Sequence, residues 1–92
     1  MHIKPFNWQA FLADEHPSRG AIERAIQAAD ESRAPLEARV VSAARADLIL
    51  ELNALRFYSG LERRDFALSA LVNCRHAYAK LKQLVEISQA PY

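Results

Sequence analysis

The chain has 92 residues and a mass of 10.4 kDa, which is enough for one small domain. Twelve Lys and Arg against eleven Asp and Glu give a formal net charge of +1, and this balance argues against a basic nucleic-acid binder or an acidic tail. Apolar residues make up 51% of the chain, so it can bury a core, and its one Cys excludes an intrachain disulfide and a Cys-based metal cluster.

The first residues do not have the pattern of a signal peptide, because they contain neither a long apolar run nor a small-residue cleavage site. No stretch approaches the roughly 18 consecutive apolar residues of a membrane span. The longest strongly apolar run, 48–50, ends at Glu51. Together with the lone Cys74, these features predict a cytoplasmic protein that does not enter a membrane.

Helix-breaking residues divide the chain into four segments, and in each the apolar residues have helical rather than alternating spacing. The first segment, 6–13, is too short to be stable alone and must dock on other helices. Its Trp8 and Phe11 either fill the protein's own core or anchor a partner. The second segment, 18–33, begins with Ser18 as a fair N-cap and carries a narrow apolar stripe, which predicts a helix with one buried edge.

The third segment, 35–59, is expected to form a long helix that is apolar on two sides. Pro35 suits its first turn, and Gly60 suits the left-handed position just past its end. One apolar sector contains Leu36, Val40, Ala43, Leu50, Ala54, Phe57 and Tyr58. A second sector contains Val41, Ala44, Leu48, Leu52 and Leu55. A helix with two apolar sides needs neighbours on two sides.

The fourth segment, 61–89, predicts the second long helix. Its apolar stripe contains Phe66, Ala70, Leu71, Cys74, Ala77, Tyr78, Leu81, Leu84 and Val85. The link at 59–60 is short, so the two long helices must form an antiparallel hairpin. The expected fold is all-α: a small helical bundle in which residues 1–92 form a single domain, with two short N-terminal helices packed on a long antiparallel helical hairpin of 35–59 and 61–89.

This hairpin is too long for the globule that a chain of this size should make. A compact chain of 92 residues has a radius of gyration of about 12 Å and hence a diameter of roughly 32 Å. Helices over 35–59 and 61–89 would span about 37 and about 43 Å. We therefore expect apolar surface on the hairpin to remain available for a second chain.

Asp47 and Glu51 lie one helical turn apart within the first apolar sector, and no Lys or Arg is three or four residues from either. Like charges at this spacing repel each other weakly. The two carboxylates are expected either to pair with an arginine of another segment or to recognise a basic partner. The candidate arginines are Arg24, Arg63, Arg64 and Arg75. A metal site would need a third ligand, for which His76 is the helical histidine available.

The remaining residues do not indicate catalysis or strong phosphate binding. Cys74 lies in the apolar stripe of the fourth segment, where burial raises the pKa of a thiol and favours a core role over a nucleophilic one. His76 lies on the polar side of that segment and is expected to be solvated. Residues 61–92 carry a surplus of only two positive charges. Because no nucleophile elbow, phosphate loop or paired-cysteine motif is present, we expect neither an enzyme nor a cofactor.

From Leu36 onward, the order of features is similar to that of a known group of proteins. Leu36-Glu37-Ala38-Arg39 opens a helix, Leu52-Asn53-Ala54-Leu55-Arg56 precedes Ser59-Gly60, and Phe66, Leu71, Ala77 and Leu81 mark a second helix. This pattern resembles the small helical-hairpin co-chaperones that hold type III secretion needle subunits in the cytoplasm. The resemblance implies that the apolar face of 61–89 is a docking surface.

The function that these observations favour is a non-enzymatic protein–protein interaction module: a homodimer, or an adaptor, chaperone or inhibitor of a partner protein. The residues expected to bind the partner are Trp8, Phe11, Asp47, Glu51, Arg64, Arg75, Tyr78 and Lys82. One alternative is a small nucleic-acid-binding regulator that uses the basic face of 61–89. Another is a metal-dependent enzyme that uses Asp47, Glu51 and His76.

Overall fold

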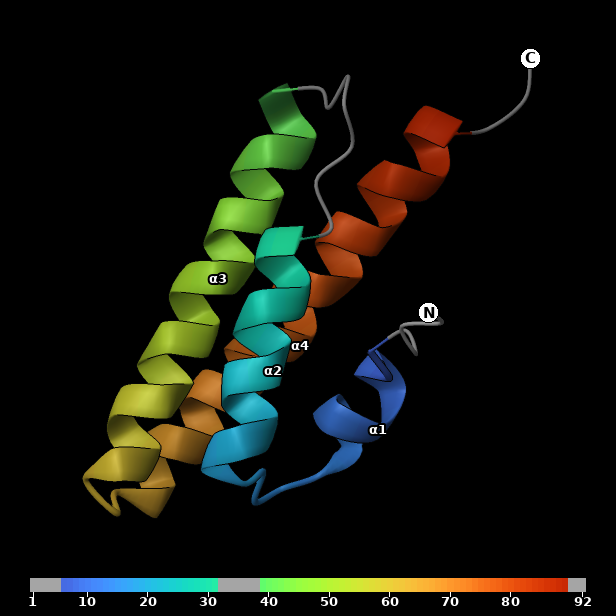
Figure 1. Cartoon of the computed structure of the whole chain (residues 1–92). Coiled ribbons are helices and arrows are strands. Elements are labelled where there is room, and N and C mark those ends of the chain that lie inside the picture. The colour runs from blue at the N-terminus through green and yellow to red at the C-terminus, as the bar shows by residue number, and fades with distance from the viewer. Residues whose placement is uncertain (1–5, 32–38, 90–92) are drawn as a thin grey trace.

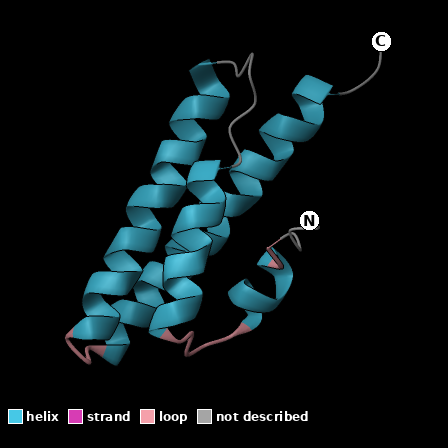
Figure 2. Cartoon of the chain, viewed as in Figure 1, coloured by secondary structure: helices cyan, strands magenta, loops and turns pink. Residues whose placement is uncertain are grey.

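The computed structural model describes residues 6–31 and 39–89, which form four α-helices and no strand (Figures 1 and 2). The helices are α1 (Trp8–Ala13), α2 (Arg19–Glu31), α3 (Arg39–Gly60) and α4 (Arg64–Gln89). α3 and α4 form an antiparallel hairpin, and the two shorter N-terminal helices pack on it. The predicted all-α fold is therefore confirmed. The proposed role of Pro35 at the start of the third helix lies outside the described residues.

Side-chain caps fix the starts of the two short helices. The Asn7 side chain accepts a hydrogen bond from the backbone N–H of Ala10 at 3.0 Å, which caps α1. The Ser18 hydroxyl accepts one from the N–H of Ala21 at 3.1 Å, so the predicted N-cap of α2 is confirmed. Each cap satisfies a backbone donor that the helix itself leaves free, which stabilises a helix by about 1 kcal/mol.

The turn between α3 and α4 differs from the sequence-based expectation. Gly60 does not adopt a positive φ; it is the last residue of α3, and Glu62 takes the left-handed conformation instead, with φ of 58°. The N–H of Arg63 donates to the carbonyl of Tyr58 at 3.1 Å, and that of Glu62 to the carbonyl of Ser59 at 3.2 Å. This is the Schellman pattern, in which the left-handed residue closes the helix. The prediction placed that residue two positions too early, because α3 continues through Gly60.

The core lies between the hairpin and the layer that α1 and α2 form on it. Its buried side chains are Phe11, Ile22, Ala25, Ala29, Leu48, Leu52, Leu55, Ala70, Leu71 and Cys74. The second apolar sector of the third segment is buried throughout, since Val41 and Ala44 are also shielded. The prediction that Cys74 is a small core residue is confirmed, because its side chain is fully buried.

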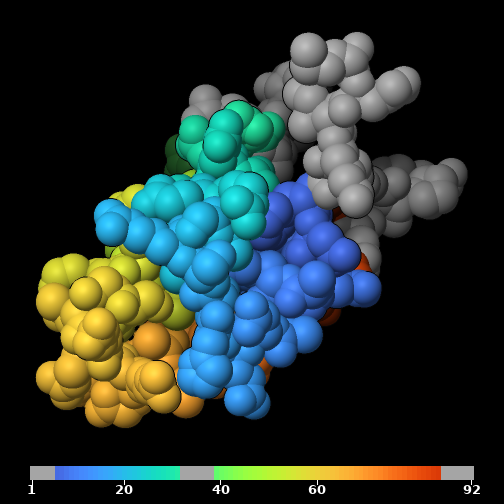
Figure 3. All heavy atoms as spheres, turned by 60° about the horizontal axis from the view of Figure 1, so that its bottom comes forward, coloured from blue at the N-terminus to red at the C-terminus, as the bar shows by residue number. Residues whose placement is uncertain are grey.

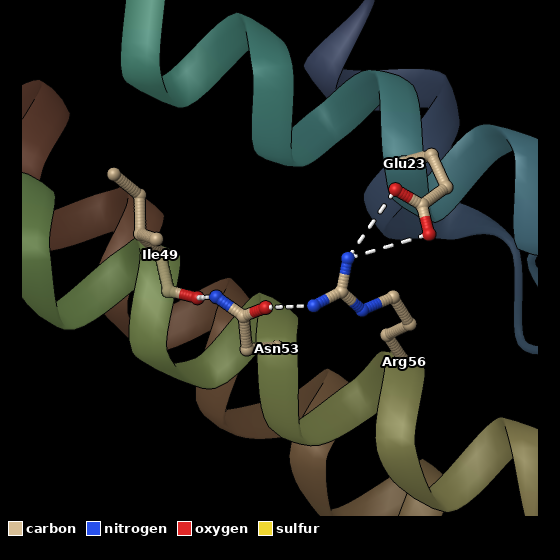
Figure 4. A network of polar contacts seen from close by, with 4 residues as sticks. All are labelled: Glu23, Ile49, Asn53 and Arg56. Atoms are coloured by element: carbon tan, nitrogen blue, oxygen red, sulfur yellow. Dashed lines mark hydrogen bonds and ion pairs between the residues drawn. The ribbon is translucent and has the colours of Figure 1, made fainter.

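A polar network joins α2 to α3 at the edge of this core (Figure 4). The Asn53 amide donates to the backbone carbonyl of Ile49 at 2.9 Å, and its oxygen accepts from Arg56 Nη2 at 2.6 Å. Arg56 Nη1 in turn lies 3.3 Å from both carboxylate oxygens of Glu23 on α2. Asn53 thus holds the guanidinium of Arg56 toward α2.

The molecule is two helix layers deep. It measures 47 × 31 × 19 Å, and a helix with its side chains is about 10 Å wide. α1 and α2 make one layer, which Figure 3 shows side by side, and the hairpin makes the other. No third layer of described residues covers the opposite side of the hairpin. The radius of gyration of 13.6 Å exceeds the roughly 12 Å of a compact chain of this length, in line with the long hairpin.

Candidate protein-interaction surface

Four of the eight residues predicted to bind a partner make contacts between α1 and the rest of the protein. Phe11 is buried in the core, and the ring of Trp8 stacks on that of Tyr78, with centroids 5.0 Å apart. Arg75 Nε donates to the backbone carbonyl of Leu12 at 2.7 Å. Trp8 and Phe11 therefore fill the protein's own core region, as one of the two sequence interpretations proposed.

The first apolar sector of the third segment forms a largely exposed row along α3, although Ala54 and Tyr58 are partly buried against the core and Leu36 lies outside the described residues. We call it the outer stripe, and it consists of Val40, Ala43, Asp47, Leu50, Ala54 and Phe57. These residues are spaced alternately by three and four positions, so they lie on one side of the helix. Val40 and Phe57 are each 61% exposed, and Leu50 is 66% exposed.

The outer stripe is exposed because both neighbours of α3 pack on its other side. α4 and α2 contact the side that carries Leu48, Leu52 and Leu55, all of which are at most 1% exposed. One helix thus has two apolar sides with opposite environments. The described residues cover one side fully, whereas Val40, Leu50 and Phe57 on the other side stay exposed.

Beside the outer stripe, a shallow groove of about 310 Å³ runs between α3 and α4. Its polar lining consists of Asp47, Glu51, Asn73, His76 and Lys80. Asp47 belongs to both surfaces, since it interrupts the outer stripe at the groove's edge. Two carboxylates, one ammonium group and a histidine thus line the groove, which leaves it with a surplus of negative charge when His76 is neutral.

The expected pairing of Asp47 and Glu51 with an arginine of another segment is not found: neither carboxylate forms an ion pair with another of the described residues. Two of the candidate arginines have other partners. Arg63 lies 3.7 Å from Asp65 and 4.5 Å above the ring of Phe66, and Arg75 is bonded to Leu12. Sequence spacing could not reveal this, because it does not say which helix faces the two carboxylates.

The groove brings together the three residues of the metal hypothesis, Asp47, Glu51 and His76. Even so, no three His, Cys, Asp or Glu side chains within residues 6–31 and 39–89 are placed to hold a metal ion. Cys74 is no nucleophile either, because burial and, secondarily, the charge of Glu51 raise its pKa to about 12.

The expected apolar stripe of α4 is buried at its centre but not at its start. Phe66, the first residue of that predicted stripe, is 43% exposed and stacks on Tyr58 beside the turn, with ring centroids 5.3 Å apart. Leu68 and Val72 are also partly exposed. The sequence pattern missed this aromatic pair, because the turn geometry, rather than the helical period, brings the two rings together.

Three of the four basic residues of α4, Arg64, Arg75 and Lys82, are 11 and 7 positions apart and so share one side of the helix, whereas Lys80 does not. Arg64 and Lys82 are exposed, as predicted; Arg75 is also exposed but is bonded to the backbone of α1, and Lys80 lines the groove on the other side of the helix. The apolar face that the co-chaperone resemblance would use for docking is occupied by the core contacts of Ala70, Leu71 and Cys74.

None of the described helices is both long and apolar enough to cross a membrane. Comparison of the chain with models of protein families, with curated proteins and with solved structures finds no match to any of them.

Proposed function

We propose that this protein is a non-enzymatic protein-interaction module that binds another protein through the outer stripe of α3. The observation that carries the proposal is the exposure of Val40, Leu50 and Phe57 in one row, on the side of α3 opposite its buried core residues. Single exposed apolar residues are common on protein surfaces, but a group of large ones along one side of a helix is typical of an interaction site.

The energetics support such a role. Removing a fully exposed Val, Leu or Phe side chain from water contributes about 1.5–3 kcal/mol, so each of these partly exposed side chains would contribute about 1–2 kcal/mol on burial. The stripe is also rigid before binding, because α3 is held by α2 and α4. Little conformational entropy is then lost on association.

The nucleic-acid alternative has less support. Electrostatic binding to phosphates requires several cations on one face. On α4, Arg75 is bonded to the backbone carbonyl of Leu12, Lys80 lines a groove that also contains two carboxylates, and only Arg64 and Lys82 remain on the side that they share with Arg75. Two predictions about the bound protein remain: that it is a second copy of this chain, or that it is a secretion needle subunit, as the co-chaperone resemblance implies.

Site-specific photo-crosslinking in the native cell tests the proposal. A photoreactive side chain at position 50 should give a discrete adduct with another protein, and one at position 72, which is exposed on α4, should not. Mass spectrometry identifies the cross-linked protein, which is then purified. It should bind the natural chain but not the Leu50→Glu variant. The melting temperature of this variant should match that of the natural chain, which shows that the variant is folded. Equal adducts from positions 50 and 72, or unchanged binding by Leu50→Glu, would contradict the proposal.

A further inference from the structure

The composition of the outer stripe restricts what can cover it. Asp47 interrupts the row between Ala43 and Leu50, so any occupant that buries these neighbours also removes water from the Asp47 carboxylate. A buried carboxylate without a counter-ion is strongly unfavourable, whereas a paired one is tolerated. No ion pair joins Asp47 to another of the described residues, so we expect the occupant to supply the cation.

We propose that the outer stripe binds an amphipathic helix of a partner protein, and that this helix presents an Arg or Lys to Asp47 and Glu51. This inference rests on the proposed function. The stripe follows one helix face for about five turns, or roughly 26 Å. A second helix can lay an apolar row along such a face, with anchors spaced three and four residues apart.

A second copy of the same chain fits the stripe less well. In a parallel pairing of two α3 helices, Asp47 meets the Asp47 of the other copy, and like charges repel. In an antiparallel pairing centred on Leu50, Asp47 faces the stretch 53–54 of the other copy, which supplies an amide and a methyl group but no cation. Either symmetric arrangement therefore leaves two carboxylates without counter-ions in an apolar contact.

The groove beside the stripe can accommodate the partner's cation. Asp47 and Glu51 lie one turn apart on its α3 side, and Asn73 adds an amide from α4. An arginine has a long stem and a planar guanidinium that can donate hydrogen bonds to two carboxylates, so it can cross the stripe and end between them. Lys80 lines the same groove and reduces the net charge of the lining to that of one carboxylate. The expected preference for a basic residue is therefore moderate.

Two fluorescent synthetic peptides test this inference by fluorescence anisotropy. Each has about 18 residues with an apolar row at helical spacing, and they differ in one central residue, which is Arg in one and Glu in the other. The natural chain should bind the Arg peptide about tenfold more tightly, since an attraction replaces a repulsion. Asp47→Asn should reduce this ratio to about threefold or less, and Asp47→Arg should reverse it. Asp30→Asn, which removes an exposed carboxylate from α2, is the charge-matched control and should leave the ratio unchanged.

The outcomes separate this inference from the proposed function. If both peptides bind equally well and Leu50→Glu weakens both, the charge selection is wrong and the apolar docking surface stands. If neither peptide binds, the helical occupant is wrong, and cross-linking from position 50 decides the proposed function independently. If sedimentation shows a dimer that Leu50→Glu dissociates, the occupant is a second copy and the inference is overturned. Each variant is used after circular dichroism shows the helical content of the natural chain.

Discussion

The side chain of Arg75 on α4 donates from Nε to the backbone carbonyl of Leu12 on α1, at a distance of 2.7 Å and across 63 positions of the sequence. This bond and the stacking of Trp8 on Tyr78 attach a helix of six residues that would not be stable alone. α1 completes one end of the core by burying Phe11. The attachment of α1 thus depends on Arg75 and Tyr78 of α4 as well as on the residues of α1.

Replacing Arg75 with Ala should loosen α1 while leaving the hairpin intact. The lost hydrogen bond is exposed to solvent, so the free energy of unfolding should fall by only about 1 kcal/mol. The fluorescence of Trp8, the one Trp of the chain, should change at a lower urea concentration than the far-ultraviolet circular dichroism. Arg64→Ala removes an exposed arginine of the same helix and should keep the two transitions together. Coincident transitions in Arg75→Ala would show that the bond does not hold α1.

The two apolar sides of α3 should respond differently to the same substitution. Leu48→Ala removes a fully buried side chain and should lower the free energy of unfolding by about 2–5 kcal/mol. Leu50→Ala removes a side chain that is 66% exposed and should change stability by about 0.5 kcal/mol or less. Urea unfolding measures both. A large loss in Leu50→Ala would mean that the outer stripe is covered in the isolated protein.

Substitutions in the turn should confirm which residue is left-handed. Glu62→Gly should raise the free energy of unfolding by up to about 1 kcal/mol, because a positive φ is unfavourable for Glu and free for Gly. Gly60→Ala should also stabilise the protein, by about 0.5–1 kcal/mol, since Gly60 is helical and an added Cβ meets no atom within 4 Å. Thermal or urea unfolding gives both values. Destabilisation by Gly60→Ala would place the left-handed residue at Gly60 after all.

Cys74 should make the protein less stable at alkaline pH. Its pKa is raised from 9.0 to about 12 in the folded protein, by burial first and by the charge of Glu51 second. Below pH 9 the thiol is neutral in both states and has no effect. Between pH 9 and 12 the unfolded chain loses the proton and the folded protein retains it, so the free energy of unfolding falls by up to about 1.4 kcal/mol per pH unit.

Unfolding in urea at pH 8 to 10.5 measures this loss. Tyr and Lys side chains also titrate in this range, so the relevant quantity is the difference between the natural chain and Cys74→Ala, in which the thiol is absent. Equal pH dependence of the two proteins would show that the thiol of Cys74 ionises as readily in the folded state as in the unfolded one.

Local patterns predicted the helices but not every end of them. Ser18 caps α2 as expected, because a serine hydroxyl satisfies the backbone donors of the following turn wherever a helix begins. Gly60 was expected to close α3, yet Glu62 does so. A glycine permits a left-handed conformation without requiring it, and the stacking of Tyr58 on Phe66 accompanies the later turn.

The candidate surface was partly predictable in the same sense. Helical spacing showed that α3 has two apolar sides, and size suggested that one would remain uncovered. The pattern did not say which side, because Leu48 and Leu50 are equally apolar and differ only in direction. Likewise, Trp8 and Tyr78 resemble partner anchors in the sequence, and the docking of α1 decided that they meet each other.

The sequence by itself determined the all-α class, the antiparallel hairpin and the presence of surplus apolar surface, since these follow from periodicity, chain breaks and length. Tertiary structure decided which surface is surplus and which charges lack partners. The physical reason is that periodicity describes one helix at a time. Burial and pairing depend on the neighbour, and α2 lies on the Leu52 side of α3 rather than on the Leu50 side.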